Sequence, residues 1–497
     1  FQSIVSKVKT MFENCKYQNV FENFARICAI PHGSYHEKAI SDYLYQFALE
    51  RGYEAVQDEA LNLLVRIPAS TGREAEPSLI LQGHMDMVCE KNADVLHDFL
   101  KDPIQLRREG DWLMAQGTTL GGDDGIAIAY MMTLMEGPSV SHPALELLMT
   151  VSEETGMDGA KNLDKSSLRS KRMINLDSEE EGVFIAGGAG GLKVEVTHTL
   201  DRAAAPAGFI PLEVKTTGFI GGHSGEDINK HRGNANAILG EYLLGWYNYC
   251  PNTRLVSLDG GSKDNAIPRE ACAKMWIPAN MLDQAERGCW WFGEDLAKEY
   301  AESDPGALIT MRRADPMTEP GWEWFPMNAT ITGEVINFLH LCPTGVRSMS
   351  QELTGMVESS QNLAVLHTEE DVWSARISLR SNLDSLLPTM VNRLHLMAEM
   401  SGMDCQASGQ YPAWNYRAES PLRSQMAEIY HKMYGHDPEI LILHAGLECG
   451  IFAEAVPDMD MVSIGPDMQG IHSPDEKLNI PSVERSWEFL LRVLAEV

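Results

Sequence analysis

The sequence is short of positive charge. Its 497 residues include 40 Lys and Arg against 71 Asp and Glu, which gives a formal net charge of −31 at pH 7. Nucleic acids and anionic membranes are bound through basic groups, so this composition argues against both as partners. Most of the acidic side chains are expected on the solvated surface, and the remainder could be grouped to hold cations.

Long hydrophobic runs and disulfide patterns are also missing. No stretch reaches the ~18 uninterrupted apolar residues of a membrane span, and the first residues, FQSIVSKVKTMFENC, lack the apolar core of a signal peptide. The nine cysteines form no C-x-x-C pair. A chain of this length does not depend on disulfides, so reduced thiols and a cytoplasmic location are expected. The chain begins at Phe1 instead of Met, as expected of a trimmed or partial sequence.

What is present is an ordinary globular composition, 44% hydrophobic and 22% charged, long enough for two or three domains. In residues 1–190, helical patterns such as HEKAISDYLYQFALERG alternate with short apolar runs such as SLILQGHMDMV, ALELLMTVSEE and KRMINLDSEEE. That alternation predicts a layered α/β domain with a mainly parallel central sheet.

The middle of the chain has a different pattern. The stretch AGGAGGLKVEVTH, followed by DRAAAPAGF, marks a boundary near residue 190. Residues 191–405 mix alternating strands with amphipathic helices, which predicts an α+β domain. Residues 406–497 return to the first pattern with LRSQMAEIYHKMYG and EILILHAG. The expected fold class is therefore α/β, with a discontinuous domain, 1–190 and 406–497, and an inserted α+β domain, 191–405.

Four acidic groups occur at or just after the predicted strands or on a glycine-rich turn. They are His84 with Asp86, Asp123 with Asp124, Glu153 with Glu154, and Asp177. Each group alone is most simply a solvated turn or a structural histidine. Parallel strands place their carboxyl ends at one edge of a sheet, where four such groups would repel one another unless cations neutralised them. Together they predict a metal site.

Histidine and carboxylate ligands without cysteine favour Zn²⁺ or a similar divalent ion in a catalytic site. Two ions about 3.5 to 4 Å apart could share one bridging carboxylate. A second histidine ligand is then required from elsewhere in the chain. His472 in GIHSPDE is the first candidate, and His97 and His444 compete for the same role.

Eight motifs occur in the order GHMDMV, GTTLGGDDGI, SEETGMDGA, NLDSEEEG, GGHSG, NAIPRE, HAGLECG and GPDMQGIHSPDE. They closely resemble the aminoacyl-histidine dipeptidases, also called β-alanyl-histidine dipeptidases or bacterial carnosinases, of the di-zinc aminoacylase and glutamate-carboxypeptidase superfamily. The resemblance runs from about residue 20 to the C-terminus. It implies that 1–190 and 406–497 form the catalytic domain and 191–405 a lid and dimerisation domain.

The resemblance also implies a ligand set for two metal ions, most simply zinc, with manganese or cobalt as alternatives. One ion would be held by His84, Asp123 and Asp177, and the other by Glu154, His472 and the bridging Asp123. The chain departs from the family in two places. Residues 290–330 carry no matching motif, and the second Asp of GGDD stands where family members often have Asn.

Further roles follow from the same resemblance. Glu153 would be the general base, and Asp86 would orient His84. In the lid, His223 would stabilise the oxyanion. The substrate's carboxylate would be held by Asn265 and Arg380, with Arg269 as an alternative. Gly446 and Glu448 would line the pocket, and Glu448 could meet a free substrate amine.

The resulting expectation is a cytoplasmic, homodimeric metallodipeptidase acting on Xaa-His and other dipeptides. An N-acyl-amino-acid amidohydrolase on the same metal site is the alternative, separated from the first only by whether a free substrate amine is required. A non-catalytic binding protein of the same fold is disfavoured, because every ligand position and the base position are filled.

Overall fold

The computed structural model describes residues 10–137, 140–316, 324–351 and 354–497. The chain forms two compact units. The first comprises Phe1–Gly188, Trp414–Ile442 and Leu447–Val497, and the second comprises Ala189–Ala413 and Leu443–Gly446. The chain returns to the first unit at Trp414 and not at residue 406, because the strand Asp404–Tyr411 pairs inside the second unit's sheet. The expected discontinuous fold with an inserted domain is confirmed.

The first unit is built on an eight-stranded sheet with the order β1-β2-β6-β3-β7-β21-β8-β20. The strands are β1 (Glu54–Gln57), β2 (Leu63–Ile67), β3 (Leu79–His84), β6 (Leu145–Thr150), β7 (Arg172–Asn175), β8 (Val183–Gly188), β20 (Glu439–Leu443) and β21 (Asp460–Ser463). The four central strands, β6, β3, β7 and β21, are parallel. The flanking pairs β1-β2, β2-β6 and β21-β8 are antiparallel, so the predicted parallel sheet is confined to the centre.

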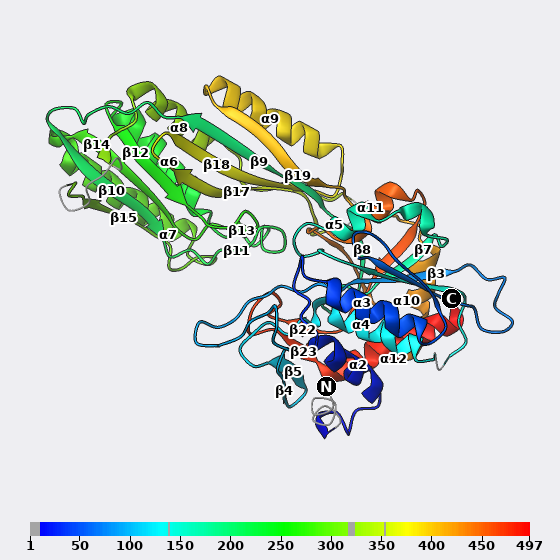
Figure 1. Cartoon of the computed structure of the whole chain (residues 1–497). Helices are drawn as coiled ribbons and strands as arrows, with labels where there is room; N and C mark the ends of the chain where they lie inside the picture. Colours follow the sequence, from blue (N-terminus) through cyan, green and yellow to red (C-terminus); the bar gives the residue numbers. More distant parts are fainter. Residues whose placement is uncertain (1–9, 138–139, 317–323, 352–353) are drawn as a thin grey trace. The chain divides into compact units, whose positions relative to one another are not determined.

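Helices cover this sheet. They are α2 (Gln18–Cys28), α3 (Lys38–Leu49), α4 (Gly122–Met135), α5 (Asp158–Asn162), α10 (Pro421–Tyr434), α11 (Glu448–Ala455) and α12 (Ile480–Glu496), with a short 3-10 turn at Lys165–Ser167. Figure 1 shows α2, α4, α10 and α12 gathered on one side of the strands, while α5 and α11 lie on the other. Helix α4 is buried on every side, as its apolar sequence GIAIAYMMTLM requires.

A small four-stranded sheet, β22-β23-β5-β4, brings residues 468–479 beside residues 106–115. Its strands are β4 (Leu106–Glu109), β5 (Trp112–Ala115), β22 (Met468–Gln469) and β23 (Lys477–Asn479). Because β22 pairs antiparallel with β23, and β23 pairs with β5, the loop between β22 and β23 is anchored at both ends. This loop carries His472.

The second unit has a nine-stranded sheet with the order β15-β10-β14-β12-β17-β18-β9-β19, and β16 pairs with β17. The strands are β9 (Gly190–Thr199), β10 (Phe209–Thr217), β12 (Arg254–Gly260), β14 (Ala271–Pro278), β15 (Leu308–Arg313), β16 (Gly345–Met349), β17 (Val357–Thr368), β18 (Val372–Ser381) and β19 (Asp404–Tyr411). A two-stranded ribbon joins β11 (Gly222–His223) to β13 (Ala266–Ile267). The helices are α6 (Ala235–Tyr249), α7 (Leu282–Glu299), α8 (Ala329–Leu341) and α9 (Leu386–Met400), with a 3-10 turn at Ala279–Met281.

The predicted α+β character of the insertion is therefore confirmed. The unmatched segment 290–330 contains the second half of α7, strand β15 and the start of α8, and residues 317–323 within it lie outside the described residues. All nine cysteines are free thiols. In the part of the chain that the structure describes, no helix combines the length and the apolar character needed to cross a membrane.

Candidate metal centre

The central parallel strands bring the predicted ligands to one edge of the first unit's sheet. His84 is the last residue of β3, Glu153 and Glu154 follow β6, and Asp177 follows β7. These three strands are neighbours in the order β6-β3-β7, so their carboxyl ends lie together. Asp123 enters from the first turn of α4.

Asp123 lies between two histidines. Its Oδ1 is 3.1 Å from His84 Nε2, and its Oδ2 is 3.1 Å from His472 Nε2. Beyond His84, Asp177 Oδ1 lies 3.5 Å from the same Nε2 atom. Beyond His472, Glu154 Oε2 lies 2.9 Å from its Nε2 atom. The five predicted ligands therefore form one continuous group, with the Asp123 carboxylate facing both halves.

The donor set fits divalent cations. Two groups of His, Asp and Glu side chains have donor atoms within 4.8 Å of one another: His84 with Asp123 and Glu154, and His84 with Asp124 and Asp177. The second group contains Asp124, whereas the ligand set expected from the sequence combines His84 and Asp177 with Asp123. Asp124 is fully buried, its Oδ2 accepts the His84 backbone N–H at 3.2 Å, and its Oδ1 has no hydrogen-bond partner among the described residues. A buried carboxylate oxygen without a donor favours a nearby cation.

The acid–base properties of the cluster agree with this fit. Burial, with the Asp123 charge adding to it, raises the pKa of Asp177 to about 6 against the opposing effect of His84. Burial and the neighbouring carboxylates also raise the pKa values of Glu153 and Glu154. Burial and the neighbouring charges thus disfavour the bare carboxylate ions, and a bound cation would offset both effects.

The two histidines titrate in the opposite sense to an ordinary buried imidazole. Burial lowers the pKa of His84, but Asp177 and the other adjacent carboxylates outweigh it and raise that pKa well above its usual value. Burial likewise lowers the pKa of His472, while its contacts with Asp123 and Glu154 prevail and raise it to about 11. Both rings lie where a positive charge is stabilised, which is the requirement for a metal site.

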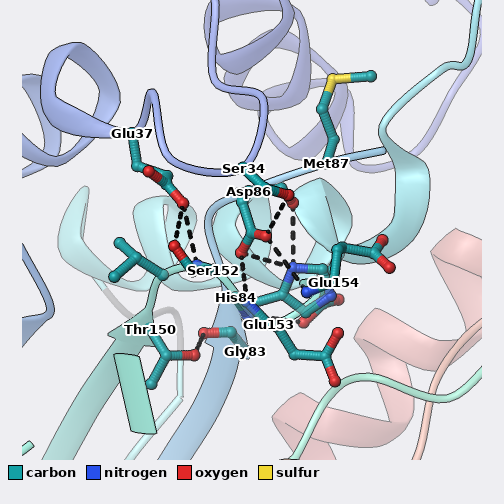
Figure 2. A network of polar contacts seen from close by, with 12 residues as sticks. Ser34, Glu37, Gly83, His84, Asp86, Met87, Thr150, Ser152, Glu153 and Glu154 are labelled. Atoms are coloured by element: carbon teal, nitrogen blue, oxygen red, sulfur yellow. Dashed lines mark hydrogen bonds and ion pairs between the residues drawn. The ribbon is translucent and has the colours of Figure 1, made fainter. Parts of the chain in front are cut away.

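Asp86 supports both His84 and the Glu153–Glu154 turn. The His84 Nδ1–H donates to the Asp86 carbonyl oxygen at 3.0 Å, and the Asp86 carboxylate lies farther away, with its Oδ1 at 3.5 Å from Nδ1. That carboxylate instead accepts the backbone N–H groups of Glu153 and Glu154, at 3.0 and 3.3 Å, and the Ser34 hydroxyl at 2.8 Å, as Figure 2 shows. The His84 imidazole is therefore oriented mainly by a backbone carbonyl, and the Asp86 side chain holds the turn that carries Glu153, the predicted base.

Three supporting residues were not identified from the sequence. Glu476, which ends the motif GIHSPDE, accepts the backbone N–H groups of Leu120, Gly121 and Gly122 at 2.6, 3.1 and 2.7 Å, and so holds the loop before Asp123. Its place in the motif was an available signal. Glu37 accepts the N–H and hydroxyl of Ser152, and Ser34 contacts Asp86. Nothing local in the sequence marks those two.

Gly83 explains the glycine in LQGHMDMV. A Cβ atom at this position would lie 2.4 Å from Asp124 Oδ2 and 2.7 Å from the Ala127 Cβ. Separations this short do not occur between real atoms, so only glycine lets strand β3 approach α4 closely enough for His84 and Asp123 to meet.

The predicted lid residues lie in the second unit, where three of them come together. His223 in β11 pairs with Ala266 of β13, and the Asn265 carbonyl accepts the Ser224 N–H at 2.8 Å. Arg380 in β18 places Nη2 3.4 Å from His223 Nε2 and donates from Nη1 to the Tyr411 hydroxyl at 3.3 Å. Gly446, which is half-buried, lies in the loop between β20 and α11.

The structure also distinguishes the three candidates for the second histidine ligand. His444 is buried with its Nε2 2.7 Å from the Ser360 hydroxyl, and His97 packs edge-on against Phe99. His472 is the candidate that contacts the carboxylate group. Arg269, the alternative residue for binding the substrate's carboxylate, donates from Nε to the Phe219 carbonyl. One of its donors is therefore already used.

Glu448, which the sequence predicts to line the pocket, lies in the first unit. It is fully buried, and its Oε2 accepts from Gln82 Nε2 and from the Thr150 hydroxyl, both at 2.6 Å. A carboxyl enclosed in this way has no exposed surface to meet a substrate amine. The predicted pocket role of Glu448 came from the family resemblance of the motif HAGLECG.

Comparisons with known proteins agree with this geometry. The family model described as Peptidase family M20/M25/M40 matches residues 80–496. The chain is 38% identical over 480 residues to the cytosol non-specific dipeptidase of Escherichia coli, covering 97% of this chain and 98% of that protein. It is similar to the crystal structure of aminoacylhistidine dipeptidase from Vibrio alginolyticus, with 37% identity, a TM-score of 0.86 and 97% of each chain covered.

A more distant likeness concerns the fold alone. The crystal structure of human carnosine dipeptidase 1 matches with a TM-score of 0.51 at 12% identity, covering 99% of this chain and 98% of that chain. The family resemblance predicted from the eight motifs is confirmed by the match over most of the length. The family model matches most of the chain, and a relative 38% identical covers nearly all of it. The chain therefore belongs to Peptidase family M20/M25/M40.

Proposed function

We propose that this protein is a metal-dependent dipeptidase that hydrolyses Xaa-His and other dipeptides, including β-alanyl-histidine. The observation that carries the proposal is the Asp123 carboxylate, which has one oxygen 3.1 Å from His84 and the other 3.1 Å from His472. A carboxylate facing two separate ligand groups is the arrangement needed for a pair of metal ions. The dipeptidase names of the two relatives at 37 and 38% identity support the reaction.

His84, Asp123 and Asp177 would hold one ion, and Asp123, Glu154 and His472 the other. Bound divalent ions in such a site polarise the scissile carbonyl and make an attacking water more acidic. Zinc suits the donor set best, because imidazole and carboxylate ligands without thiolates are typical of catalytic zinc. Manganese and cobalt remain alternatives of the proposal.

Glu153 is the proposed general base. Its backbone N–H is held by Asp86, so the side chain is fixed beside the ligands although it is not itself paired with a histidine. Burial raises its pKa well above the usual range, which makes the carboxylate a stronger base than an exposed glutamate. Glu153 would take a proton from the attacking water and return it to the leaving amine.

The second unit would contribute to substrate binding. Arg380 is buried, its Nε has no hydrogen-bond partner among the described residues, and its Nη atoms contact the Tyr411 hydroxyl and the His223 ring instead of a carboxylate. A buried guanidinium without a counter-ion favours an anionic ligand, and the free carboxylate of a dipeptide is one. His223, whose Nε2 lies 3.4 Å from Arg380 Nη2, would stabilise the oxyanion, and Asn265 and Gly446 would help to position the substrate.

A relative and the cysteines both bear on the cellular location. The relative in Escherichia coli is named as a cytosolic enzyme, and nine unpaired cysteines agree with a reducing compartment. We place this protein in the cytoplasm on those grounds. We also propose a homodimer formed through the second unit, which carries exposed Trp290 and Trp291 on α7.

The test is the release of free histidine from β-alanyl-histidine by protein stripped of metal, before and after Zn²⁺ is restored. Activity that returns only with the metal supports the proposal. If protein with verified metal content stays inactive on this and other dipeptides but cleaves N-acyl amino acids, the amidohydrolase alternative is correct.

A further inference from the structure

The three ligand-bearing strands share an unusual feature: each also carries a buried polar side chain just before its ligand. Gln82 stands two residues before His84 in β3, Thr150 ends β6 four residues before Glu154, and Asn175 ends β7 two residues before Asp177. All three polar side chains are fully buried. Central strands of a parallel sheet are otherwise almost continuously apolar, so three polar residues at equivalent places require an explanation.

The three side chains are joined across the strands. Asn175 Nδ2 donates to Gln82 Oε1 at 2.7 Å, and Gln82 Nε2 donates to Glu448 Oε2 at 2.6 Å. The Thr150 hydroxyl donates to the same Glu448 oxygen at 2.6 Å and lies 3.3 Å from the Gly83 carbonyl, the contact drawn in Figure 2. We call Gln82, Thr150, Asn175 and Glu448 the strand-end network.

Glu448 is the acceptor on which the network converges. It is the first residue of α11, a helix that packs on α5 and β8. Its carboxyl is fully buried and makes no ion pair among the described residues, and Oε1 has no hydrogen-bond partner among them. Burial raises the pKa of Glu448 to about 7. A buried carboxyl with one unpaired oxygen is costly, and an apolar residue would fill this position at lower cost if packing were its only purpose.

The network is also close to the ligands in the chain. Each strand has at most three residues between its network member and its ligand, so a displacement of the strand end reaches the ligand over a short length of backbone. Hydrogen bonds from Asn175 through Gln82 to Thr150 and Glu448 therefore fix the spacing of β7, β3 and β6 at the point where the ligands leave them. Outer groups that orient metal ligands commonly change metal affinity when they are removed.

We propose that the strand-end network is a positioning device that sets the separation of the ligand-bearing strand ends and thereby the metal affinity and the placement of Glu153. The inference rests on the proposed function for the identity of the bound ions and the base. It assigns Glu448 a role through Gln82 and Thr150, without contact to the substrate.

The experiment measures Zn²⁺ affinity by competition with a chelator, and the visible absorption spectrum of the Co²⁺-substituted protein, on the full chain. Glu448→Leu removes the shared acceptor, and Glu448→Gln keeps one oxygen that can accept both bonds. The matched control is Glu146→Gln, a buried carboxylate on the same strand β6 but at its opposite end, where it contacts Arg66.

We expect Glu448→Leu to weaken Zn²⁺ binding about 10- to 100-fold and to change the Co²⁺ spectrum. Glu448→Gln and Glu146→Gln should bind Zn²⁺ within about threefold of wild type, even if Glu146→Gln unfolds more easily. Should Glu448→Leu fail to fold, Thr150→Val decides the question, because it removes one hydroxyl while keeping the side chain's shape.

Two results would overturn the inference: wild-type metal affinity and spectrum in both Glu448→Leu and Thr150→Val, or an equal loss of affinity in Glu146→Gln. The first would make the network purely structural, and the second would trace the effect to general destabilisation. Because metal affinity is measured without a peptide, a wild-type protein that binds metal yet cleaves no dipeptide refutes the proposed function alone.

Discussion

Glu153→Gln is expected to abolish most of the turnover while leaving the metal in place. The Glu153 carboxylate makes no hydrogen bond or ion pair with another described residue, whereas Glu154 Oε2 lies 2.9 Å from His472 Nε2. The substitution therefore removes no ligand contact. Loss of a general base typically costs about 10²- to 10⁴-fold in rate, which corresponds to about 3 to 5 kcal/mol in the activation barrier.

The same substitution should not destabilise the metal-free protein at neutral pH. Burial raises the pKa of Glu153 well above its unfolded value. A carboxyl with a raised folded-state pKa contributes stability at low pH that is lost as the pH rises through that pKa, so ionisation of Glu153 opposes folding. Replacing Glu153 by glutamine, a neutral amide of nearly equal size, removes the loss of stability that ionisation causes.

The assay pairs the initial rate of β-alanyl-histidine hydrolysis with metal content measured by mass spectrometry, and it uses Glu154→Gln as the matched variant. Glu154→Gln should lose metal, because it replaces a proposed carboxylate ligand with a neutral amide. The reasoning is refuted if Glu153→Gln loses metal and Glu154→Gln keeps it, since the roles of the two neighbours would then be reversed. Full activity in Glu153→Gln would refute the general-base assignment altogether.

Three further predictions concern packing, the second unit and the metal. Gly83→Ala should lower the free energy of unfolding in urea by about 1 to 3 kcal/mol, because its Cβ would lie 2.4 Å from Asp124 Oδ2. The control Gly245→Ala in α6, which meets nothing within 4 Å, should raise that free energy by about 0.5 to 1 kcal/mol; equal effects would contradict the steric argument. His223→Ala should reduce kcat with unchanged metal content, and unaltered kinetics would return His223 to a structural role. Restored Zn²⁺ should raise the melting temperature of stripped protein more at pH 7 than at pH 5, because burial raises the pKa of Asp177 to about 6 and this carboxyl ionises between the two pH values. A smaller rise in melting temperature at pH 7 than at pH 5 would count against Asp177 as a ligand.

The elements were largely predictable, and the cluster of candidate metal ligands could be proposed, because their signals are local. Helix α10 (Pro421–Tyr434) and strand β3 follow from three-to-four spacing and from an apolar run, respectively. The proposed ligands His84, Glu154 and Asp177 stand directly at or after such runs, and their carboxylate and imidazole donors suit the predicted ions.

Strand pairing and side-chain partners were less predictable, because they depend on residues distant in the chain. The chain leaves the second unit only at Trp414 since β19 pairs with β9, a contact that spans more than two hundred residues. The antiparallel edges of the first sheet arise in the same way, from partners that no local pattern specifies.

The sequence by itself thus determined the family, the order of the elements and the chemistry of the ligands, because each depends on residue types at short spacing. Only the tertiary structure decided how those ligands are held. It placed the Asp86 carboxylate on the Glu153–Glu154 turn, the Glu476 carboxylate on the loop before Asp123, and Glu448 beneath the strand ends. These contacts form between segments that meet only when the chain is folded, so burial and hydrogen-bond geometry, not residue type alone, set their roles.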